Sequence, residues 1–159
     1  MSATLEPVFG ANVDATRPTN VLVVGVGGQG VIMVSKVMAR IAQLHCREIK
    51  QSEVHGMAKR GGSVFSHVRF GAEVWAPTIA LGEADVVVAL EWAEGLRWLP
   101  YLNPVSGSLI VDTKRIVPPF GCIDRRRGAT LAYPDTRIAE VAAHVPNLYA
   151  LDAEGMAEA

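Results

Sequence analysis

The chain has 159 residues, with 15 Lys or Arg against 16 Asp or Glu, so its formal net charge at pH 7 is −1. This balance argues against a nucleic-acid-binding or anionic-membrane surface, and the length predicts one domain with a proper core. Half of the residues are hydrophobic and only 19% are charged, which suggests that a partner covers some apolar surface.

Residues 1–19 contain two prolines and a glycine, with no positively charged start and no apolar core of signal-peptide length. We interpret them as a flexible or partner-draped N-terminal arm ahead of a domain that spans residues 20–159. No run approaches the roughly 18 apolar residues that a membrane-spanning helix needs, so no membrane span is expected. The expected location is the cytoplasm.

An apolar run at Val21–Val24 leads into Gly25-Val-Gly-Gly-Gln-Gly30, and a helical pattern continues to about Leu44. The glycine spacing matches the dinucleotide-binding fingerprint between a strand and a helix. We expect Gly25 to adopt backbone angles closed to other residues, and Gly27 to let a ligand or a strand come close. Two interpretations stay open: the loop binds a phosphate, or it is only a structural turn.

The helix that follows is expected to begin at about Gly28, where unpaired N–H groups can bind an anion, and Gly30 is expected to allow tight helix–sheet packing. A dinucleotide site also needs an acid at the end of the second strand. Glu48, in a short strand predicted over His45–Lys50, is the candidate, but polar neighbours leave no clean strand end there. This argues against ordinary NAD binding and favours another phosphate or a subunit contact.

A second glycine-rich segment, predicted as a loop over Gln51–Gly62, precedes a strand that begins at Ser63. Lys59 and Arg60 could clamp a phosphate or carboxylate, or could be solvated charges that pair with Glu53. We interpret His55 as a hydrogen-bonding or interface residue rather than a proton carrier. The candidate cofactor-binding residues of the two segments are Gly25, Gly27, Gly28, Gln29, Gly30, Glu53, His55, Lys59, Arg60, Gly61 and Gly62.

Taken together, the two glycine segments and a strand ending near Arg69 resemble the gamma domain of the 2-oxoacid:ferredoxin oxidoreductases, most of all the small beta subunit of the indolepyruvate type. The resemblance runs from about Asn20 to Asp152. It implies a Rossmann-like subunit of a thiamine-diphosphate enzyme that oxidatively decarboxylates an aryl 2-oxoacid, passes the acyl group to coenzyme A, and sends electrons through iron–sulfur clusters to ferredoxin.

The resemblance also implies a division of labour within a complex. This chain would help bind coenzyme A and close the active site, with no catalytic residue or metal of its own. Thiamine diphosphate, magnesium and [4Fe-4S] clusters would lie on large partner subunits, and ferredoxin or another acceptor would be reached through the complex. The cysteines, Cys46 and Cys122, are too few and too far apart for a cluster, and we expect reduced thiols.

Further along the chain, the unbroken run Val86–Leu90 predicts a central parallel strand. Glu91 at its carboxyl end contacts a ligand or a partner, or only favours the start of the next helix, which is predicted over Trp92–Leu102. His67 is expected to pack against a neighbour. The remaining expected elements are a strand at Leu109–Val111, a hairpin at Cys122–Ile123 and Ala129–Leu131 with a solvated Arg125–Arg127 tip, a helix at Asp135–His144 capped by Asp135 or Thr136, and a strand at Leu148–Leu151.

The predicted fold is therefore an α/β, Rossmann-like three-layer sandwich with a mostly parallel sheet and a small hairpin insertion. Members of the family usually continue through another helical stretch, which we expect to be lacking from residues 20–159. Three other functions stay open: a subunit of a related arylglyoxylate oxidoreductase, a stand-alone nucleotide-binding or interaction module, and a purely structural subunit.

Overall fold

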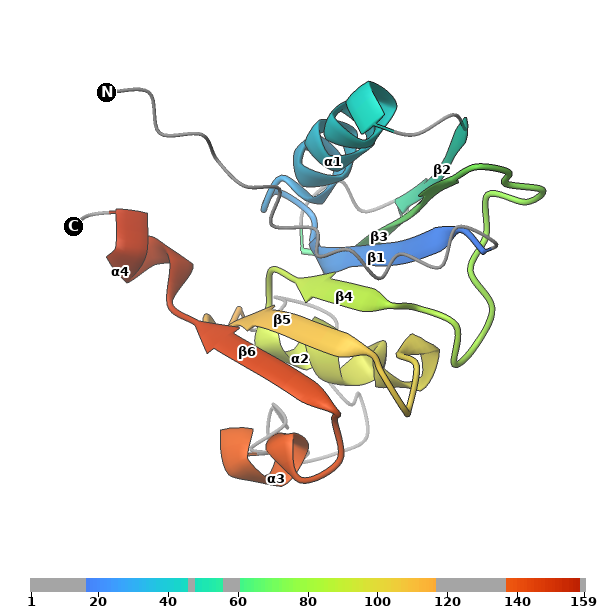
Figure 1. Ribbon diagram of the computed structural model, residues 1–159. Coiled ribbons are helices and arrows are strands. Elements are labelled where there is room, and N and C mark those ends of the chain that lie inside the picture. The colour runs from blue at the N-terminus through green and yellow to red at the C-terminus, as the bar shows by residue number, and fades with distance from the viewer. Residues whose placement is uncertain (1–16, 46–47, 56–60, 117–136, 158–159) are drawn as a thin grey trace, which may run out of the picture.

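The computed structural model describes residues 17–45, 48–55, 61–116 and 137–157, and shows one six-stranded sheet in the order β2-β3-β1-β4-β5-β6 (Figure 1). β1, β4, β5 and β6 are parallel, whereas β3 runs antiparallel to both β1 and β2. The predicted mixed α/β fold with a mostly parallel sheet is confirmed. The strands are β1 (Thr19–Val26), β2 (Glu48–His55), β3 (Ser63–Gly71), β4 (Val86–Ala89), β5 (Ser108–Asp112) and β6 (Asn147–Leu151).

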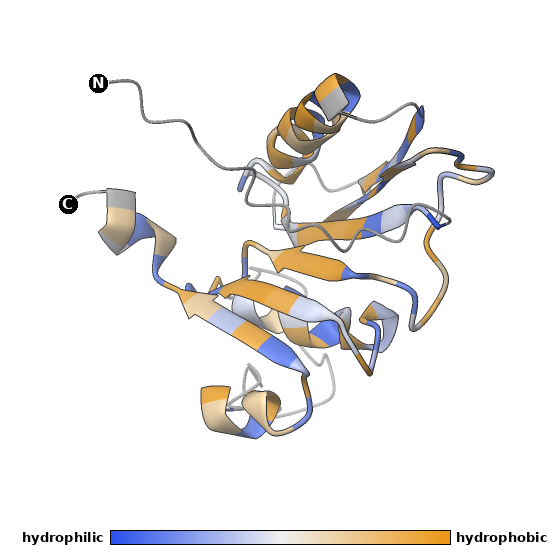
Figure 2. Ribbon diagram, in the orientation of Figure 1, coloured by the Kyte–Doolittle hydropathy of each residue, from blue (hydrophilic) through white to orange (hydrophobic). Residues whose placement is uncertain are grey.

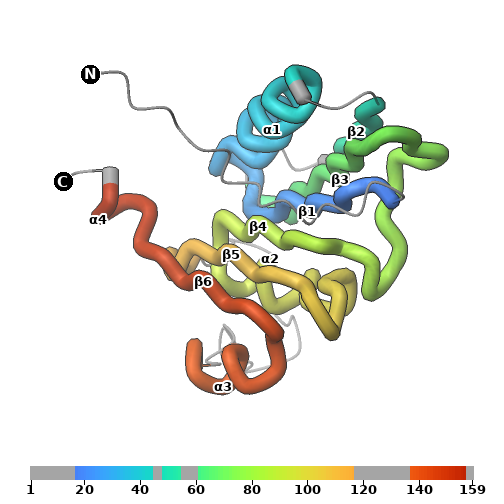
Figure 3. The backbone as a smooth tube through the Cα atoms, viewed as in Figure 1, coloured from blue at the N-terminus to red at the C-terminus, as the bar shows by residue number. Residues whose placement is uncertain are grey.

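Helices cover both faces of the sheet. α1 (Val31–His45) packs on β1, β2 and β3, whereas α2 (Trp92–Arg97) packs on β1, β4 and β5, and α3 (Ile138–Ala142) packs on β6. A short 3-10 helix, η1 (Leu99–Tyr101), follows α2, and α4 (Ala153–Ala157) follows β6. Figure 3 shows that the chain up to β3 builds one half of the sheet and the chain from β4 builds the other. None of the described helices is long and apolar enough to cross a membrane.

The centre of the sheet is buried on both faces, which explains why β1 reads as an unbroken apolar run. Successive side chains of a strand point to opposite faces, so β1 contributes to two cores. Val21 and Val23 join Val31 of α1 in one core. Leu22 and Val24 join Trp92 of α2 in the other.

β2 is longer than the sequence pattern indicated. The segment Gln51–His55, predicted as part of a loop, continues the strand and pairs with β3 in register up to His55 opposite Val64. β2 is an edge strand with polar residues along it, so it lacks the apolar alternation that identifies a half-buried strand. The strand prediction of His45–Lys50 was therefore wrong in its bounds, because pairing and not hydrophobicity sets them.

The position of β2 also explains why the sequence has no acidic residue where a dinucleotide-binding site needs one, at the end of the second strand. In a doubly wound dinucleotide site, the second strand lies parallel beside the first. Here β3 lies antiparallel beside β1, and β2 lies one strand further out. Glu48 stands at the beginning of β2, where its carboxylate accepts a hydrogen bond from the Val74 amide at 2.8 Å. It therefore lies at the end of the sheet opposite the glycine-rich loop.

The second half of the chain follows the predicted order with shorter helices, and α4 after β6 was not predicted. The helix predicted over 92–102 is α2 followed by η1, with Pro100 within η1. The helix predicted over Asp135–His144 is α3 in the described residues, and the Glu140 carboxylate accepts a hydrogen bond from the Arg137 amide at 3.3 Å. The predicted hairpin at 122–131 and the caps Asp135 and Thr136 lie outside the described residues.

The carboxyl ends of β1 and β4 are joined by one side chain, Gln29, which lies between β1 and α1. Its Oε1 accepts a hydrogen bond from the Val26 amide at 2.8 Å, and its Nε2 donates to the Leu90 carbonyl at 2.5 Å. A Cβ on Gly25 would lie 2.9 Å from Val31 Cγ2 and 3.0 Å from Gln29 Oε1. Gly25 is therefore required by this close approach and not, as we predicted, by unusual backbone angles.

His67 of β3 is buried and packs against neighbours, as its alternation predicted. Its Nδ1 accepts a hydrogen bond from the Ile79 amide at 3.2 Å, and its ring lies edge-on to those of Phe65 and Tyr101. Burial, and then the nearby Arg69 charge, lower the pKa of His67 from its ordinary value of 6.5. Both effects favour the neutral imidazole over its charged form.

Replacing Gln29 tests the hydrogen-bonded link that its side chain makes between β1 and β4. In Gln29→Glu the side chain keeps its length but loses the donor to Leu90, and a carboxylate then faces a carbonyl. We expect the free energy of unfolding to fall by about 1–3 kcal/mol in urea denaturation. The control is Gln43→Glu, an exposed glutamine on α1, which should change stability by less than about 0.5 kcal/mol. Equal unfolding midpoints for Gln29→Glu and the wild type would contradict a stabilising role for this link.

The lowered pKa of His67 predicts a pH dependence of stability. Below pH 6.5 the unfolded chain takes up a proton that the folded chain resists, so stability is full above this pH and falls as the pH is lowered. One such group contributes at most about 1.4 kcal/mol per pH unit. In His67→Asn we expect lower stability overall and a shallower dependence between pH 5 and 7, measured by urea denaturation. His144→Asn, at an exposed position, is the control; an unchanged slope in His67→Asn would refute the assignment.

Candidate functional site

The two glycine-rich segments, far apart in the sequence, meet in the structure. The Gly27 amide donates a hydrogen bond to the Gly62 carbonyl at 2.8 Å, and the Gly61 amide donates to the Gly27 carbonyl at 3.4 Å. This contact continues the antiparallel pairing of β1 with β3, in which Val26 is opposite Ser63. The close approach predicted at Gly27 is therefore to a neighbouring segment of the same chain.

The turn into α1 depends on glycine at two positions. Gly28 and Gly30 have φ angles of 105° and 87°, a region that other residues rarely adopt. A Cβ on Gly28 would meet no atom within 4 Å, so the backbone there borders open space. α1 itself begins at Val31, three residues later than predicted. The glycine edge, by which we mean Gly27, Gly28 and Gly61, thus presents bare backbone at the carboxyl end of β1.

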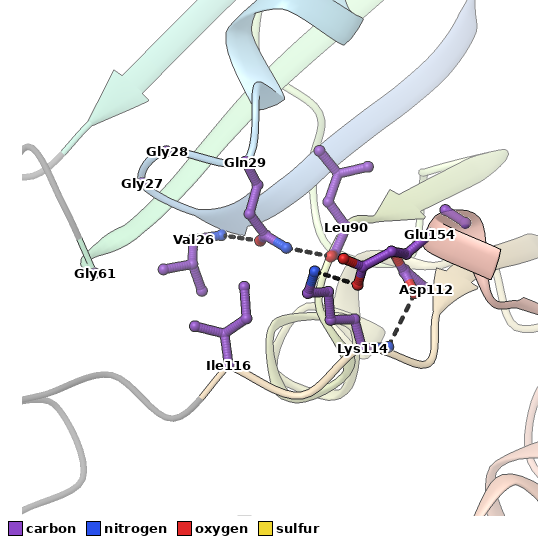
Figure 4. A pocket seen from close by; sticks show the side chains of 11 residues that line it. Val26, Gly27, Gly28, Gln29, Gly61, Leu90, Asp112, Lys114, Ile116 and Glu154 are labelled. Atoms are coloured by element: carbon purple, nitrogen blue, oxygen red, sulfur yellow. Dashed lines mark hydrogen bonds and ion pairs between the residues drawn. The ribbon is translucent and has the colours of Figure 1, made fainter. Parts of the chain in front are cut away.

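An open pocket of about 730 Å³ lies beside this glycine edge (Figure 4). It is at the carboxyl ends of β1, β4 and β5. The helices that follow β1 and β4 cover opposite faces of the sheet, and the pocket lies where these two strands end side by side. Open α/β sheets bind ligands at such a point. The lining residues are Val26, Gly27, Gly28, Gln29, Gly61, Leu90, Asp112, Lys114, Ile116, Ala153 and Glu154.

The charged groups of the pocket lie across from the glycine edge (Figure 4). Lys114 Nζ contacts Glu154 Oε2 of α4 at 2.6 Å, and Asp112 Oδ1 accepts a hydrogen bond from the Lys114 amide at 2.9 Å. The hydrogen bond and charge of Glu154 raise the pKa of Lys114, with smaller contributions from Asp112 and Asp152. Lys114 is therefore a cation at the pocket, beside carboxylates that can accept hydrogen bonds.

Glu91, for which a ligand contact and a helix-start role were both open, is buried and caps α2. One carboxylate oxygen accepts a hydrogen bond from the Glu94 amide at 2.8 Å, and the other accepts from the Ile116 amide at 3.1 Å. The second contact fixes the chain just after Lys114. Glu91 thus positions one wall of the pocket, and it is not among the residues that line the pocket.

The neighbouring Glu94 connects α2 to the second glycine segment. It is 4% exposed, and its Oε2 accepts hydrogen bonds from Ser63 Oγ at 2.5 Å and from Trp98 Nε1 at 3.3 Å. Arg97 lies 3.4 Å from the other oxygen. Because Ser63 directly follows Gly62, this carboxylate holds the start of β3, next to the second glycine segment, against α2.

The structure brings most of the predicted site residues together. Gly25, Gly27, Gly28, Gln29, Gly30, Gly61 and Gly62 gather at the carboxyl end of β1. Glu53 and His55 both belong to the edge strand β2, and Glu53, which does not line the pocket, accepts a hydrogen bond from Gln51 Nε2 at 2.8 Å. Lys59 and Arg60 lie outside the described residues. Among the described residues, no three His, Cys, Asp or Glu side chains are grouped to hold a metal.

Sequence reasoning missed the opposite wall of the pocket. Lys114 was not singled out because one lysine two residues after a strand has no motif around it. Glu154 was missed because α4 itself was not predicted. The usable signal was the strand ending at Asp112, since polar residues after parallel strands gather at one edge of the sheet.

Comparison with known proteins gives the family of the chain. A family model described as pyruvate ferredoxin/flavodoxin oxidoreductase matches residues 20–159. The indolepyruvate oxidoreductase subunit IorB of Archaeoglobus fulgidus is 42% identical over 87% of this chain and 67% of its own length. IorB of Methanothermobacter thermautotrophicus is 44% identical over 64% of this chain and 50% of its own length. The chain thus spans between half and two thirds of these relatives.

Two solved structures share the fold. Pyruvate oxidoreductase subunit PORC of Thermotoga maritima has a TM-score of 0.58 at 18% identity, over 89% of this chain and 65% of its own. The 2-oxoglutarate:ferredoxin oxidoreductase of Magnetococcus marinus, solved with 2-oxoglutarate, coenzyme A and succinyl-CoA, has a TM-score of 0.57 at 15% identity, over 89% of this chain and 21% of its own. The predicted resemblance is confirmed: the chain belongs to the pyruvate ferredoxin/flavodoxin oxidoreductase family and is similar, within it, to the IorB subunit of indolepyruvate oxidoreductase.

Proposed function

We propose that this chain is the non-thiamine-binding subunit of a thiamine-diphosphate-dependent aryl 2-oxoacid ferredoxin oxidoreductase of the indolepyruvate type. It helps to bind coenzyme A and closes the active site during oxidative decarboxylation. Thiamine diphosphate, magnesium and [4Fe-4S] clusters belong to a large partner subunit, and electrons leave to ferredoxin or another acceptor. The IorB relatives support the assignment, and we place the complex in the cytoplasm.

The pocket beside the glycine edge is the observation that carries the coenzyme A part of this proposal. Coenzyme A is large and anionic, and a volume of about 730 Å³ lies in the usual range for ligand pockets. The glycine edge lets a phosphate approach the backbone, and Lys114 supplies a positive charge. Asp112 and Glu154 disfavour a phosphate on their own side, but they can accept hydrogen bonds from the hydroxyl and amide groups of such a ligand.

In this proposal the residues of the chain bind and position, and the chemistry is supplied by the partner's cofactors. Lys114 now pairs with Glu154 at 2.6 Å, so it must exchange that carboxylate for a ligand phosphate. Because both side chains are partly exposed, this exchange has a low cost in solvation. The same exchange would release α4, the helix that carries Glu154, from the Lys114 side of the pocket.

One observation favours a second candidate, a purely structural subunit. The Gly27 amide, the Gly27 carbonyl and both polar atoms of the Gln29 side chain are bonded within the chain. A glycine loop whose polar groups serve the fold does not need a ligand. This candidate predicts the same assembly with the large subunit and no contribution to coenzyme A binding.

Replacing Lys114 separates the two candidates. In the assembled complex, we expect Lys114→Ala to raise the KM for coenzyme A on the order of tenfold, because a charge-assisted contact to phosphate is lost. The decarboxylation half-reaction, measured without coenzyme A, should keep its rate. Lys50→Ala, a lysine at the start of the edge strand β2, is the control and should leave both quantities unchanged. An unchanged KM in Lys114→Ala would favour the structural subunit. Arg60→Ala tests the clamp predicted from the sequence in the same assay.

A further inference from the structure

The pocket has two walls that come from distant parts of the chain. One wall is the glycine edge, which the turn after β1 and the segment before β3 form together. The other wall is the segment after β5 that carries Lys114 and Ile116 (Figure 4). In the sheet, β1 and β4 lie between β3 and β5. The separation of the two walls therefore depends on the contacts that connect the start of β3 with the end of β5.

Two buried carboxylates at the start of α2 make this connection. Glu94 Oε2 accepts a hydrogen bond from Ser63 Oγ at 2.5 Å, at the residue that follows the second glycine segment. Glu91 Oε1 accepts a hydrogen bond from the Ile116 amide at 3.1 Å, on the other wall. Glu91 Oε2 accepts from the Glu94 amide at 2.8 Å, which joins the two contacts. We call Ser63, Glu94, Glu91 and Ile116 together the carboxylate brace.

Packing alone does not explain why carboxylates stand at these positions. Glu91 is 1% exposed and Glu94 is 4% exposed, and Figure 2 shows hydrophobic colouring through the middle of β1, β4 and β5, on which α2 packs. Removing a carboxylate from water costs free energy, and apolar side chains join buried elements without that cost. Capping of α2 accounts for one oxygen of Glu91, but not for the contacts to Ser63 and Ile116.

The contact to Ser63 lies at the end of a longer line of contacts between β3 and the helix layer. Ser63 and Phe65 are two residues apart on β3, so they point to the same face of the sheet. The ring of Phe65 lies 4.3 Å from that of Trp98, between centroids, and Trp98 Nε1 donates to the same Glu94 oxygen at 3.3 Å. Loss of the Ser63 contact would therefore free the start of β3, with the adjoining glycine segment, while the rest of the strand stays packed.

We propose that the carboxylate brace fixes the separation of the two pocket walls, and that Ser63 and Glu94 are positioning residues for the ligand. Neither residue lines the pocket, so both act through the glycine segment that precedes Ser63. A ligand that contacts both walls needs this fixed separation, because a misplacement of about 1 Å removes much of the advantage of a preformed site. Naming coenzyme A as that ligand rests on the proposed function; the carboxylate brace does not.

Hydrogen exchange in the full chain tests whether the walls are linked. In Ser63→Ala, we expect the Ile116 amide on the other wall to exchange on the order of fivefold faster, because the brace is broken at its first contact. Ser63→Thr keeps the hydroxyl and should restore the wild-type rate. The matched control is Ser66→Ala, which removes a buried hydroxyl of the same strand that accepts from Gln51 Nε2 at 3.3 Å, and it should not change exchange at Ile116. Unchanged exchange at Ile116 in Ser63→Ala would overturn the proposal.

Kinetics of the assembled complex test whether the link positions the ligand. We expect Ser63→Ala to raise the KM for coenzyme A on the order of fivefold, and to change it more than kcat. Ser63→Thr should restore the KM and Ser66→Ala should not change it, a pattern that a general loss of stability does not produce. If Lys114→Ala raises the KM and Ser63→Ala does not, the positioning role is refuted. If neither variant raises the KM while exchange at Ile116 is faster, the link between the walls is supported and the coenzyme A part of the proposed function fails.

Discussion

The arrangement of this domain depends on how closely β1, β4 and α1 meet at the glycine-rich turn. A parallel pair has no hairpin to join its ends, so another group must satisfy the backbone where the strands stop. Gln29 does this with one amide, which accepts from the end of β1 and donates to the residue after β4. The amide fits only because Gly25 leaves no Cβ in its way. The first role of the glycine motif is therefore structural: it links the ends of β1 and β4.

The parts of the fold that the sequence predicted well are those in which burial dictates the pattern. β1 and β4 lie under helices on both faces near the centre of the sheet, so Val21–Val24 and Val86–Leu90 had to be apolar without interruption. α1 needed one buried side, which gave it a helical period. The edge strand β2 was missed in part because pairing with β3 needs backbone groups and not a particular side chain. Its Gln51–His55 segment is polar, and polar residues after a strand resemble a loop.

The candidate site also has one part that could be predicted from the sequence and one part that could not. Its glycine-rich turn could be predicted because a sharp turn and a close contact restrict the residue type to glycine at Gly25, Gly28 and Gly30. Its charged wall could not, because Lys114 and Glu154 are 40 positions apart and meet only through the pairing of β5 with β6. Glu91 was an intermediate case. Its position after β4 was informative, but only the contacts to the amides of Glu94 and Ile116 decide that it positions the pocket wall.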